Sequence, residues 1–292
     1  LRIMGKRVGV PGLRIINQEE LVEKEPNANG LVALLSPTGA IVDSKNLLKT
    51  VAREAENLGA TYMFDAPVEK ILGTEIITRG NSLKSDFVIN CAGLNADKIA
   101  HMMDVGLDYQ IIPFKGNYME VSFPINSMLY QPPDLKFPFL GVHLTRKING
   151  KTFAGPTATL SLGRENYGGE IDWKETLNYF HSTNFRKMAL NKEFLENAVK
   201  NIKFSLTKSA FFDEVKELVT LNIKEEDLHS SSFCGIRAQL VDRKGVMLKD
   251  ILIEETEKSL HILNAVSPGM TCSLAFAEYI VKRLEAKKTI GV

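Results

Sequence analysis

The sequence predicts a mixed α/β fold in which a parallel-sheet domain is interleaved with a domain built on an antiparallel sheet. Segment 86–97 is an apolar strand that runs into a turn of small residues, as in a parallel sheet covered on both faces. Residues 44–59 have the apolar spacing of an amphipathic helix. From residue 108 the chain changes to short alternating segments separated by proline and glycine, which is typical of antiparallel strands.

The helix expected at 44–59 has clear ends. Asp43 or Ser44 can cap its amide end and Gly59 suits its carboxyl end. Its apolar stripe consists of Leu47, Leu48, Val51, Ala55 and Leu58.

Strands are expected next, at 61–64 and 67–71, and a hairpin around 80–82 leads to the strand that ends at Cys91. A helix followed by strands is the order of a mononucleotide-binding sheet after its first crossover.

Residues 108–229 predict antiparallel strands and then helices. The alternating pieces 118–121 and 151–154 indicate strands, and Asn149-Gly150 is a strong hairpin turn. A helical block is expected over about 172–219. Its apolar anchors are Leu177, Phe180, Phe185, Leu195, Ala198, Ile202 and Phe204.

After residue 230 the pattern of the parallel sheet returns, with strands expected at 234–241, 250–255 and 260–264. A closing helix follows. Its apolar stripe consists of Leu274, Ala277, Ile280, Val281 and Leu284.

The composition is that of a globular protein with one large or two ordinary domains. Of 292 residues, 44% are hydrophobic and 24% are charged, with 36 basic against 35 acidic side chains. A net charge of +1 gives no footprint for nucleic acid, so no nucleic-acid partner is expected. No run of residues is long and apolar enough to cross a bilayer, and no signal peptide is visible at the observed start. We therefore expect a cytoplasmic protein, with peripheral membrane contact left open.

The three cysteines, Cys91, Cys234 and Cys272, are far apart and have apolar or small neighbours. No pair has metal-ligand or Cys-x-x-Cys spacing, so reduced, mostly buried thiols and no metal site are expected.

The turn at Cys91-Ala92-Gly93 lacks side-chain bulk where a strand ends. Ligands of open α/β sheets lie at the carboxyl ends of strands, and such a turn lets the backbone approach a flat or phosphorylated cofactor. A plain strand-to-helix connection explains the same residues.

Five further segments accompany this turn. They are 36–43 (SPTGAIVD), 140–145 (LGVHLT), 154–158 (AGPTA), 234–239 (CGIRAQ) and 264–271 (NAVSPGMT). In this order and spacing the set resembles the FAD-dependent oxidoreductases of the D-amino-acid oxidase superfamily, most closely the L-2-hydroxyglutarate dehydrogenase/oxidase family, from about residue 10 to 284. The resemblance implies FAD as cofactor and an incomplete FAD/NAD(P)-binding Rossmann-like domain interleaved with an antiparallel-sheet substrate domain.

The resemblance also implies the domain limits. Segment 1–43 is assigned to the substrate domain, 44–107 to the FAD-binding domain, 108–229 to the substrate domain and 230–292 to the return of the FAD-binding domain. Members of this family begin with a Gly-x-Gly-x-x-Gly turn and a helix that bind the FAD pyrophosphate, and this sequence contains no Gly-x-Gly. We expect that the amino-terminal portion has been lost from this sequence, with a natural remnant as the alternative.

The segment Ser267-Pro268-Gly269-Met270-Thr271 follows a predicted strand and opens the closing helix, so its free amides predict an anion site. Ordinary helix capping is the alternative. The resemblance implies that this helix start faces the flavin pyrimidine edge. It implies the following cofactor-binding residues: Val68 through its backbone, Cys91, Ala92, Gly93, Ser267, Pro268, Gly269, Met270 and Thr271.

His143 is the candidate catalytic base. Oxidation of a 2-hydroxy acid needs a hydroxyl proton removed as hydride leaves the carbon, and the pKa of histidine suits this near neutrality. A structural histidine within a strand is the alternative, and is the more frequent reason for a lone histidine in a strand. The other histidines show no partner in the sequence: His101, His181, His229 and His261.

Arg237 is the candidate clamp for a substrate carboxylate, because a guanidinium in an apolar strand requires a partner and can hold a carboxylate through two bonds. An internal salt bridge is the alternative, and the resemblance favours the ligand. Lys115 and Tyr118 form a second polar cluster that matches a family segment near the flavin. Lys115 could assist the reduced flavin or a second carboxylate, or be a solvated loop lysine.

The function that the resemblance implies is FAD-dependent oxidation of L-2-hydroxyglutarate to 2-oxoglutarate by hydride transfer to the flavin. The electrons then pass to a quinone or oxygen. One alternative is a related flavin oxidoreductase that acts on another small anion, such as glycerol 3-phosphate or an amino acid. Another is a non-catalytic fragment that lacks the pyrophosphate site.

Overall fold

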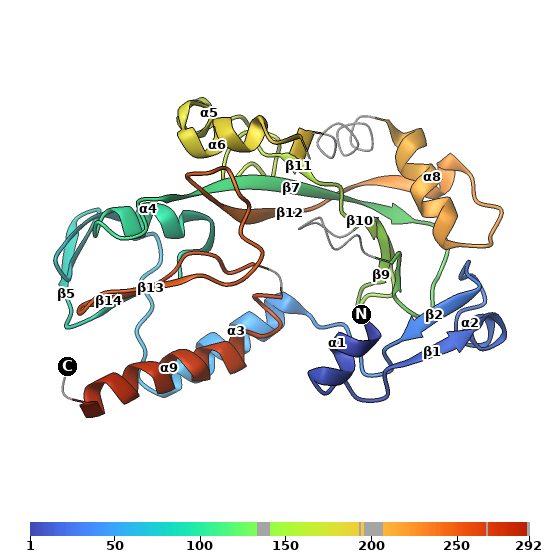
Figure 1. Ribbon diagram of the computed structural model, residues 1–292, viewed down its shortest axis with the longest axis horizontal. Coiled ribbons are helices and arrows are strands. Elements are labelled where there is room, and N and C mark those ends of the chain that lie inside the picture. Colours follow the sequence, from blue (N-terminus) through green and yellow to red (C-terminus); the bar gives the residue numbers. More distant parts are fainter. Residues whose placement is uncertain (133–140, 193, 196–206, 267, 291–292) are drawn as a thin grey trace. The chain divides into compact units, whose positions relative to one another are not determined.

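The computed structural model describes residues 1–132, 141–192, 194–195, 207–266 and 268–290 (Figure 1). Its elements in chain order are α1 (Arg2–Arg7), β1 (Arg14–Asn17), α2 (Gln18–Lys24), β2 (Val32–Leu35), α3 (Ser44–Asn57), β3 (Val68–Leu72), β4 (Glu75–Thr78), β5 (Asn81–Lys84), β6 (Val88–Asn90), η1 (Gly93–Asn95), α4 (Ala96–His101), β7 (Tyr109–Val121), β8 (Leu129–Tyr130), β9 (His143–Arg146), β10 (Thr152–Gly155), β11 (Thr159–Leu160), α5 (Trp173–His181), α6 (Thr183–Ala189), α8 (Lys208–Leu218), η2 (Glu225–Asp227), β12 (Leu228–Asp242), β13 (Ile253–Glu255), β14 (Ser259–Ile262) and α9 (Ser273–Ile290).

The chain divides into two compact units. The first unit contains 1–63, 116–159 and 198–235, and the second contains 64–115, 160–197 and 236–292. Relative to the limits expected from the sequence, 44–63 and 230–235 fall in the first unit, and 108–115 and 160–197 fall in the second. The placement of 160–197 has a visible cause, because Arg164 pairs with Asp97 of α4 as well as with Glu175.

A six-stranded sheet has the order β11-β7-β10-β9-β8, with β12 also paired to β7. Strands β7, β10, β9 and β8 pair in antiparallel fashion, which confirms the antiparallel strands predicted from residue 108. The hairpin at Asn149-Gly150 is also confirmed, since Lys147 N–H donates to the Lys151 carbonyl and Gly150 adopts a φ of +82°. The assignment of 234–241 to the parallel sheet is wrong, because β12 pairs with β7 instead.

The two faces of this sheet differ in the first unit. On one face, the side chains of Val121, Leu144 and Ala154 form a core with Phe211 and Val215 of α8. Neighbouring residues of a strand face opposite sides, so His143 and Phe153 belong to the other face. We call that side the outer face.

The helices after β11 are anchored partly by other residues than the sequence predicted. Phe185 is buried as expected, and Tyr179 and Met188 are fully buried beside it. Leu177 and Phe180 are exposed instead, because the buried side of α5 is the one that carries Tyr179. Leu195 is exposed as well, and the predicted anchors Ala198, Ile202 and Phe204 lie outside the described residues.

The second unit contains a sheet of order β13-β14-β6, in which β6 and β14 are parallel, as predicted. Strand β13 is antiparallel to β14, so the expectation of a parallel strand at 250–255 is wrong. Val88 and Asn90 are buried but Ile89 is 49% exposed, so the prediction of a strand covered on both faces is wrong for the Ile89 side. Strands β3, β4 and β5 form an antiparallel sheet that confirms the hairpin around 80–82. The strand expected at 61–64 is absent because residues 64–65 form a turn.

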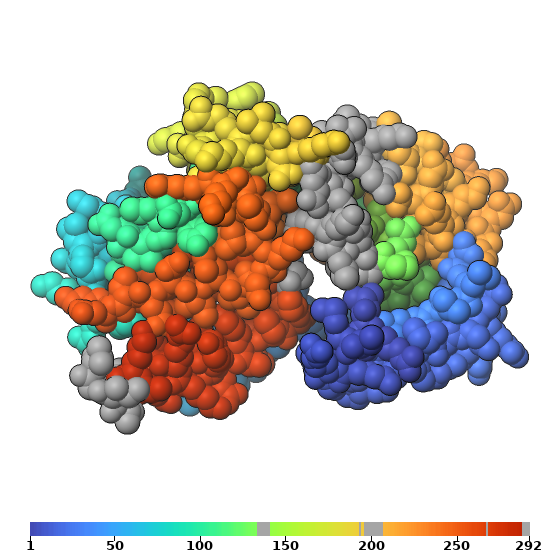
Figure 2. All heavy atoms as spheres, viewed as in Figure 1, coloured from blue at the N-terminus to red at the C-terminus, as the bar shows by residue number. Residues whose placement is uncertain are grey.

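Helix α3 is confirmed, and its cap is Asp43, whose carboxylate accepts from the Lys45 and Asn46 amides. Its apolar stripe contains no buried residue, so the amphipathic pattern predicts the helix but not its burial. Figure 2 shows α1 (dark blue) and α9 (red) at the surface, where the apolar side chains of Ile3, Met4, Leu274 and Val281 are exposed. Within α9, Ile280 is the buried residue of the predicted stripe. None of the helices described combines the length and the apolar character needed to cross a membrane.

Candidate functional site

His143 stands in a row of residues that crosses the outer face of the six-stranded sheet. The register pairs it with Tyr130 on β8 and with Gly155 on β10. Continuing the β10–β7 register places Tyr118 beside Gly155. A Cβ at Gly155 would lie 2.6 Å from a ring carbon of Tyr118, so only glycine lets the tyrosine ring lie over this position.

Five aromatic side chains form a connected cluster on this face. His143 stacks on Tyr130 with ring centroids 4.6 Å apart, and its edge faces Tyr118 at 6.4 Å. Tyr118 lies 4.8 Å from Phe233 of β12, which in turn contacts Phe153 at 5.6 Å. We call these five residues the aromatic cluster. Because Tyr130 and Phe233 are 51% and 40% exposed, the cluster is accessible from solvent.

The hydrogen bonding of His143 fixes which ring nitrogen can act as a base. Its Nδ1 lies 3.1 Å from the Gly141 carbonyl oxygen. A carbonyl oxygen can only accept, so Nδ1 carries the proton and Nε2 presents a lone pair. Burial lowers the pKa of His143 below its ordinary value, although the Gly141 contact acts in the opposite direction. A neutral imidazole with an unprotonated Nε2 is the form that a general base requires.

A lysine, which the sequence analysis did not identify, completes the outer face. The Lys147 Nζ lies 3.1 Å from the Phe233 ring centroid and 4.2 Å from that of Phe153. Burial lowers the pKa of Lys147; nearby Lys45 lowers it further and Glu120 raises it. The alternation of His143, Thr145 and Lys147 along one strand is the signal that could have placed this lysine beside the histidine.

Lys115 and Tyr118 do not form the polar cluster that the sequence predicted. They are three residues apart in β7 and belong to different units, and Lys115 Nζ donates to the carbonyls of Asn166 and Tyr167 at 2.7 and 3.0 Å. Tyr118 joins the aromatic cluster, where burial raises the pKa of its hydroxyl. The alternative of a loop lysine is wrong too, because Lys115 lies within a strand.

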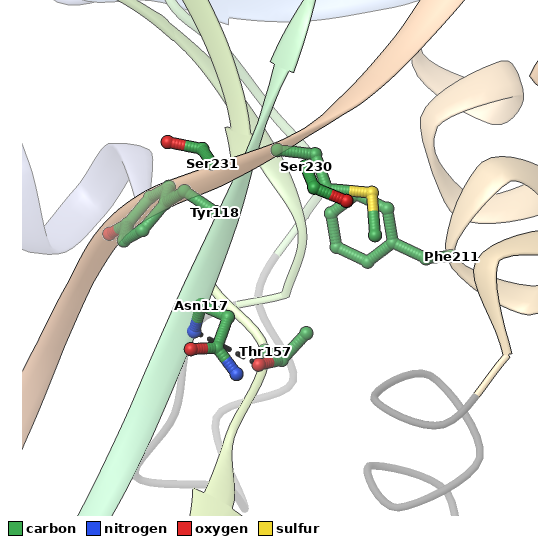
Figure 3. A pocket seen from close by; sticks show the side chains of 7 residues that line it. Asn117, Tyr118, Thr157, Phe211, Ser230 and Ser231 are labelled. Carbon is green, nitrogen blue, oxygen red and sulfur yellow. Dashed lines mark hydrogen bonds between the residues drawn. The ribbon is translucent and has the colours of Figure 1, made fainter. Parts of the chain in front are cut away.

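A pocket of the first unit adjoins this region (Figure 3). Its lining residues are Asn117, Tyr118, Met119, Thr157, Phe211, Ser230 and Ser231. The Asn117 backbone N–H donates to Thr157 Oγ1 at 3.0 Å, and Figure 3 shows these two residues together, apart from the ring of Tyr118. The polar groups of the pocket come from three segments of the chain, which no local sequence motif indicates.

Arg237 lies in the part of β12 that belongs to the second unit. Its side chain is half-buried, and burial lowers the pKa of the guanidinium. Desolvation of a guanidinium is costly, so a carboxylate partner is expected for Arg237. Its role as a clamp stays a prediction.

The turn after β6 fits backbone contact with FAD. Strands β6 and β14 are parallel neighbours, so both carboxyl ends lie at one edge of their sheet. Gly93 adopts a φ of +53°, and a Cβ built there would meet nothing within 4 Å. The turn is therefore open to a flat ligand. Val68, half-buried in β3, offers only its backbone to the role that the resemblance implies.

Asn90 organises this turn from the end of β6. Its Oδ1 accepts from the Ala92 amide at 3.1 Å, and its Nδ2 donates to the Ala96 carbonyl at 2.7 Å and to His261 Nδ1 at 3.1 Å. His261 Nε2 in turn contacts Ser259 Oγ at 2.8 Å. All three side chains are buried, so the turn is held by a fully engaged polar network.

The expected thiol burial is wrong. Cys91 is exposed, and Cys234 and Cys272 are half-buried. Cys91 follows the end of β6 and Cys272 lies in the turn before α9, whereas Cys234 lies within β12. Among the residues that the structure describes, no group of histidine, cysteine, aspartate and glutamate side chains has the arrangement of a metal site.

The second predicted cofactor turn differs from its expected form. Ser267 lies outside the described residues, and Pro268, Gly269, Met270 and Thr271 form turns before α9 begins at Ser273. The prediction that the helix opens at 267 is therefore wrong. The Gly269 amide is not free either, because it donates to the Val266 carbonyl at 2.8 Å.

The four remaining histidines all have hydrogen-bond partners, which their sequence contexts did not indicate. His101 Nε2 contacts the Gly106 and Tyr109 carbonyls, His181 Nδ1 contacts the Leu177 carbonyl, and His229 Nε2 contacts the Ser122 hydroxyl. Both ring nitrogens of His261 have partners, the Asn90 amide and the Ser259 hydroxyl.

The second unit also contains a buried ion network that the sequence analysis missed. Arg164, only 6% exposed, makes two bonds to Asp97 at 2.5 and 2.9 Å and one to Glu175 at 2.6 Å. The hydrogen bonds and charges of these carboxylates raise the pKa of Arg164 against the opposing effect of burial. Its partners are far away in sequence, so no local pattern indicates them.

Comparison with known proteins agrees with this fold. Residues 2–283 match the family described as FAD dependent oxidoreductase (DAO). L-2-hydroxyglutarate dehydrogenase of Indibacter alkaliphilus is 35% identical over 96% of this chain and 72% of its own length. The proteins of that name from Escherichia coli K12 and from human mitochondria are 30% and 29% identical, over 98% and 97% of this chain and 69% and 66% of their own.

Solved structures show the same fold at low sequence identity. L-α-glycerophosphate oxidase from Mycoplasma pneumoniae, solved with FAD bound, has a TM-score of 0.68 and 17% identity over 97% of this chain and 67% of its own. Glycine oxidase from Geobacillus kaustophilus has a TM-score of 0.55 and 14% identity, over 96% and 66%. The mixed α/β fold predicted from the sequence is thus confirmed, and the chain belongs to the DAO family of FAD-dependent oxidoreductases.

Proposed function

We propose that this flavoenzyme oxidises L-2-hydroxyglutarate to 2-oxoglutarate. The observation that carries the proposal is the match, over nearly the whole chain, to proteins named L-2-hydroxyglutarate dehydrogenase. The position of a neutral histidine on the outer face supports it, because oxidation of a hydroxy acid requires a base for the hydroxyl proton.

In this proposal His143 Nε2 accepts the proton of the substrate hydroxyl. The Gly141 carbonyl holds Nδ1 protonated, and the stacked Tyr130 ring keeps the imidazole in its plane. The resulting imidazolium can release its proton to solvent at the exposed side of the aromatic cluster. When bound, FAD supplies the acceptor for the hydrogen that leaves the substrate carbon, and a quinone or oxygen would take the electrons onward.

We further propose that the second unit carries the cofactor. The backbone at Cys91-Ala92-Gly93 and at residues 268–271 would hold FAD, with Val68 beside the adenine. Arg237 would clamp the substrate carboxylate, since its guanidinium can form a bidentate, charge-assisted pair.

The proposal is tested by anaerobic reduction of the flavin in the purified holoenzyme. L-2-Hydroxyglutarate should bleach the flavin absorbance, whereas the D enantiomer and glycerol 3-phosphate should act much more slowly, because a substrate held by its carboxylate presents one face of its carbon. Equal rates with both enantiomers would remove the basis for this substrate.

The same assay tests Arg237. Arg237→Met should weaken substrate binding by about tenfold to a hundredfold, which corresponds to a lost charge-assisted bond of about 1.5 to 3 kcal/mol. Arg243→Met is the matched control, because Arg243 lies just beyond the end of β12 and pairs with Asp108 at the surface. Unchanged substrate affinity in Arg237→Met would show that this arginine forms a structural salt bridge instead.

A further inference from the structure

Lys147 is a cation held against aromatic rings without a carboxylate. Its ammonium lies over Phe233 and Phe153, and among the residues that the structure describes no acidic side chain forms an ion pair with it. Glu120, the acid whose charge raises the pKa of Lys147, forms its ion pair with Lys151 at 3.0 Å. Lys45 adds a second positive charge nearby, so the local potential favours an anion.

The strand register places this ammonium at a defined distance from the proposed base. On the outer face, His143 pairs with Gly155 and Thr145 pairs with Phe153, so Phe153 lies one row beyond the histidine. Successive rows on one face are roughly 7 Å apart. Lys147 starts in the row after that, paired with Lys151, and its side chain leans back over Phe153.

We propose that Lys147 binds the distal carboxylate of a dicarboxylic substrate whose hydroxyl lies at His143. This inference rests on the proposed function and deepens it, because it assigns the residue that distinguishes a dicarboxylate from a monocarboxylate. A carboxylate three bonds beyond the reacting carbon comes within reach of the flexible four-carbon side chain of lysine. The rings of Phe153 and Phe233 would hold the ammonium in place and exclude water from one side of it.

A purely structural cation–π contact is the competing explanation. It accounts for the contact with the rings, but such a contact is worth only about 0.5 to 1 kcal/mol at an exposed site. It does not explain two lysines, Lys45 and Lys147, close together beside a cluster that is open to solvent. An anionic ligand would relieve that repulsion.

The test measures binding of two unreactive ligands by titration calorimetry. Glutarate carries both carboxylates, and pentanoate replaces one of them by a methyl group. The parent protein should bind glutarate more tightly. Lys147→Met should weaken the binding of glutarate by about tenfold to a hundredfold, which corresponds to the loss of one charge-assisted hydrogen bond. The affinity for pentanoate should stay within about twofold of the parent. Lys147→Arg should restore much of the affinity for glutarate.

Lys151→Met is the matched control, because Lys151 lies opposite Lys147 in the same hairpin but pairs with Glu120. It should bind glutarate like the parent, and every variant should show the parent melting temperature. Parent-like glutarate binding by Lys147→Met, or a parent that binds both ligands equally, would overturn the proposal.

Flavin reduction by L-2-hydroxyglutarate is measured separately on the parent holoenzyme. If the parent protein prefers glutarate to pentanoate through Lys147 but its flavin is not reduced by L-2-hydroxyglutarate, the proposed function is refuted and the dicarboxylate site is retained.

Discussion

At the scale of single residues, His143 owes its chemical state to three neighbours. The Gly141 carbonyl fixes its tautomer, Tyr130 stacks on its ring, and the sheet removes it from water. Histidine in an exposed strand would be half charged near its ordinary pKa. Here burial keeps it neutral into a lower pH range.

Replacing His143 by asparagine should slow flavin reduction by about 10² to 10⁴-fold, the usual contribution of a positioned general base. Asparagine cannot accept the hydroxyl proton but nearly keeps the side-chain size, so substrate affinity should stay within about tenfold. Stopped-flow absorbance of the flavin at several substrate concentrations separates the two effects.

The pH profile of the same reaction gives an independent check. The base works when deprotonated, so activity should fall as the pH drops through the pKa of His143. Because burial lowers that pKa, this acid limb should lie below 6.5 in the parent and be missing in His143→Asn. His229→Asn is the control, because His229 is exposed and contacts the Ser122 hydroxyl. If His143→Asn reduced the flavin at the rate of the parent protein, His143 would not be the base.

At the scale of elements, the short strand β6 and the turn after it depend on one side chain. Asn90 satisfies the Ala92 amide, the Ala96 carbonyl and His261 at once. Asn90→Ala would leave buried partners without hydrogen bonds, so the free energy of unfolding should drop by about 1 to 3 kcal/mol. The holoenzyme should also lose FAD more readily, since the proposed cofactor turn is no longer held.

Urea denaturation and the release of fluorescent flavin on dilution measure these two effects. Asn81→Ala is the control, because Asn81 lies exposed in the β4–β5 hairpin. If Asn90→Ala kept both the parent stability and the parent flavin affinity, Asn90 would have no organising role.

The elements also show which parts of the fold the sequence could predict. Local patterns sufficed for α3, with its cap at Asp43, and for the hairpin at Asn149-Gly150. They failed where tertiary pairing decides, as in β12, whose apolar pattern suits a parallel sheet but which pairs with β7. They also failed for the start of α9, because the chain makes extra turns before Ser273.

The candidate site shows the same limit. His143 could be proposed as the base from its chemistry alone, but Tyr130, Phe233 and Lys147 reach the same face from separate segments through strand pairing. No spacing in the sequence indicates that these residues lie close together. Lys115 was misplaced for a related reason, because its alternation with Tyr118 in β7 sends the two side chains to different partners.

At the scale of the whole molecule, the second unit depends on the network around Arg164. Arg164→Met would leave Asp97 buried without its cation, and removing one partner of a buried pair destabilises by about 3 to 5 kcal/mol. The exposed pair Arg243–Asp108, with both side chains more than 60% exposed, should contribute less than about 1 kcal/mol.

Chemical denaturation of Arg164→Met and Arg243→Met, side by side, measures the contrast. Equal losses of stability in the two variants would show that the buried network is not what holds 160–197 to α4.

The pairing of β6 with β14 has a consequence for synthesis. Asn90 and His261 are 171 residues apart, so when β6 leaves the ribosome its parallel neighbour does not yet exist. At about 5 to 20 residues per second, roughly ten to thirty seconds pass before β14 is available. During this interval the backbone edge of β6 and its apolar side chains have no native neighbour, and an unpaired edge is a template for association with other chains. The nascent protein therefore has a period in which its own fold does not yet protect the strand that precedes the proposed cofactor turn.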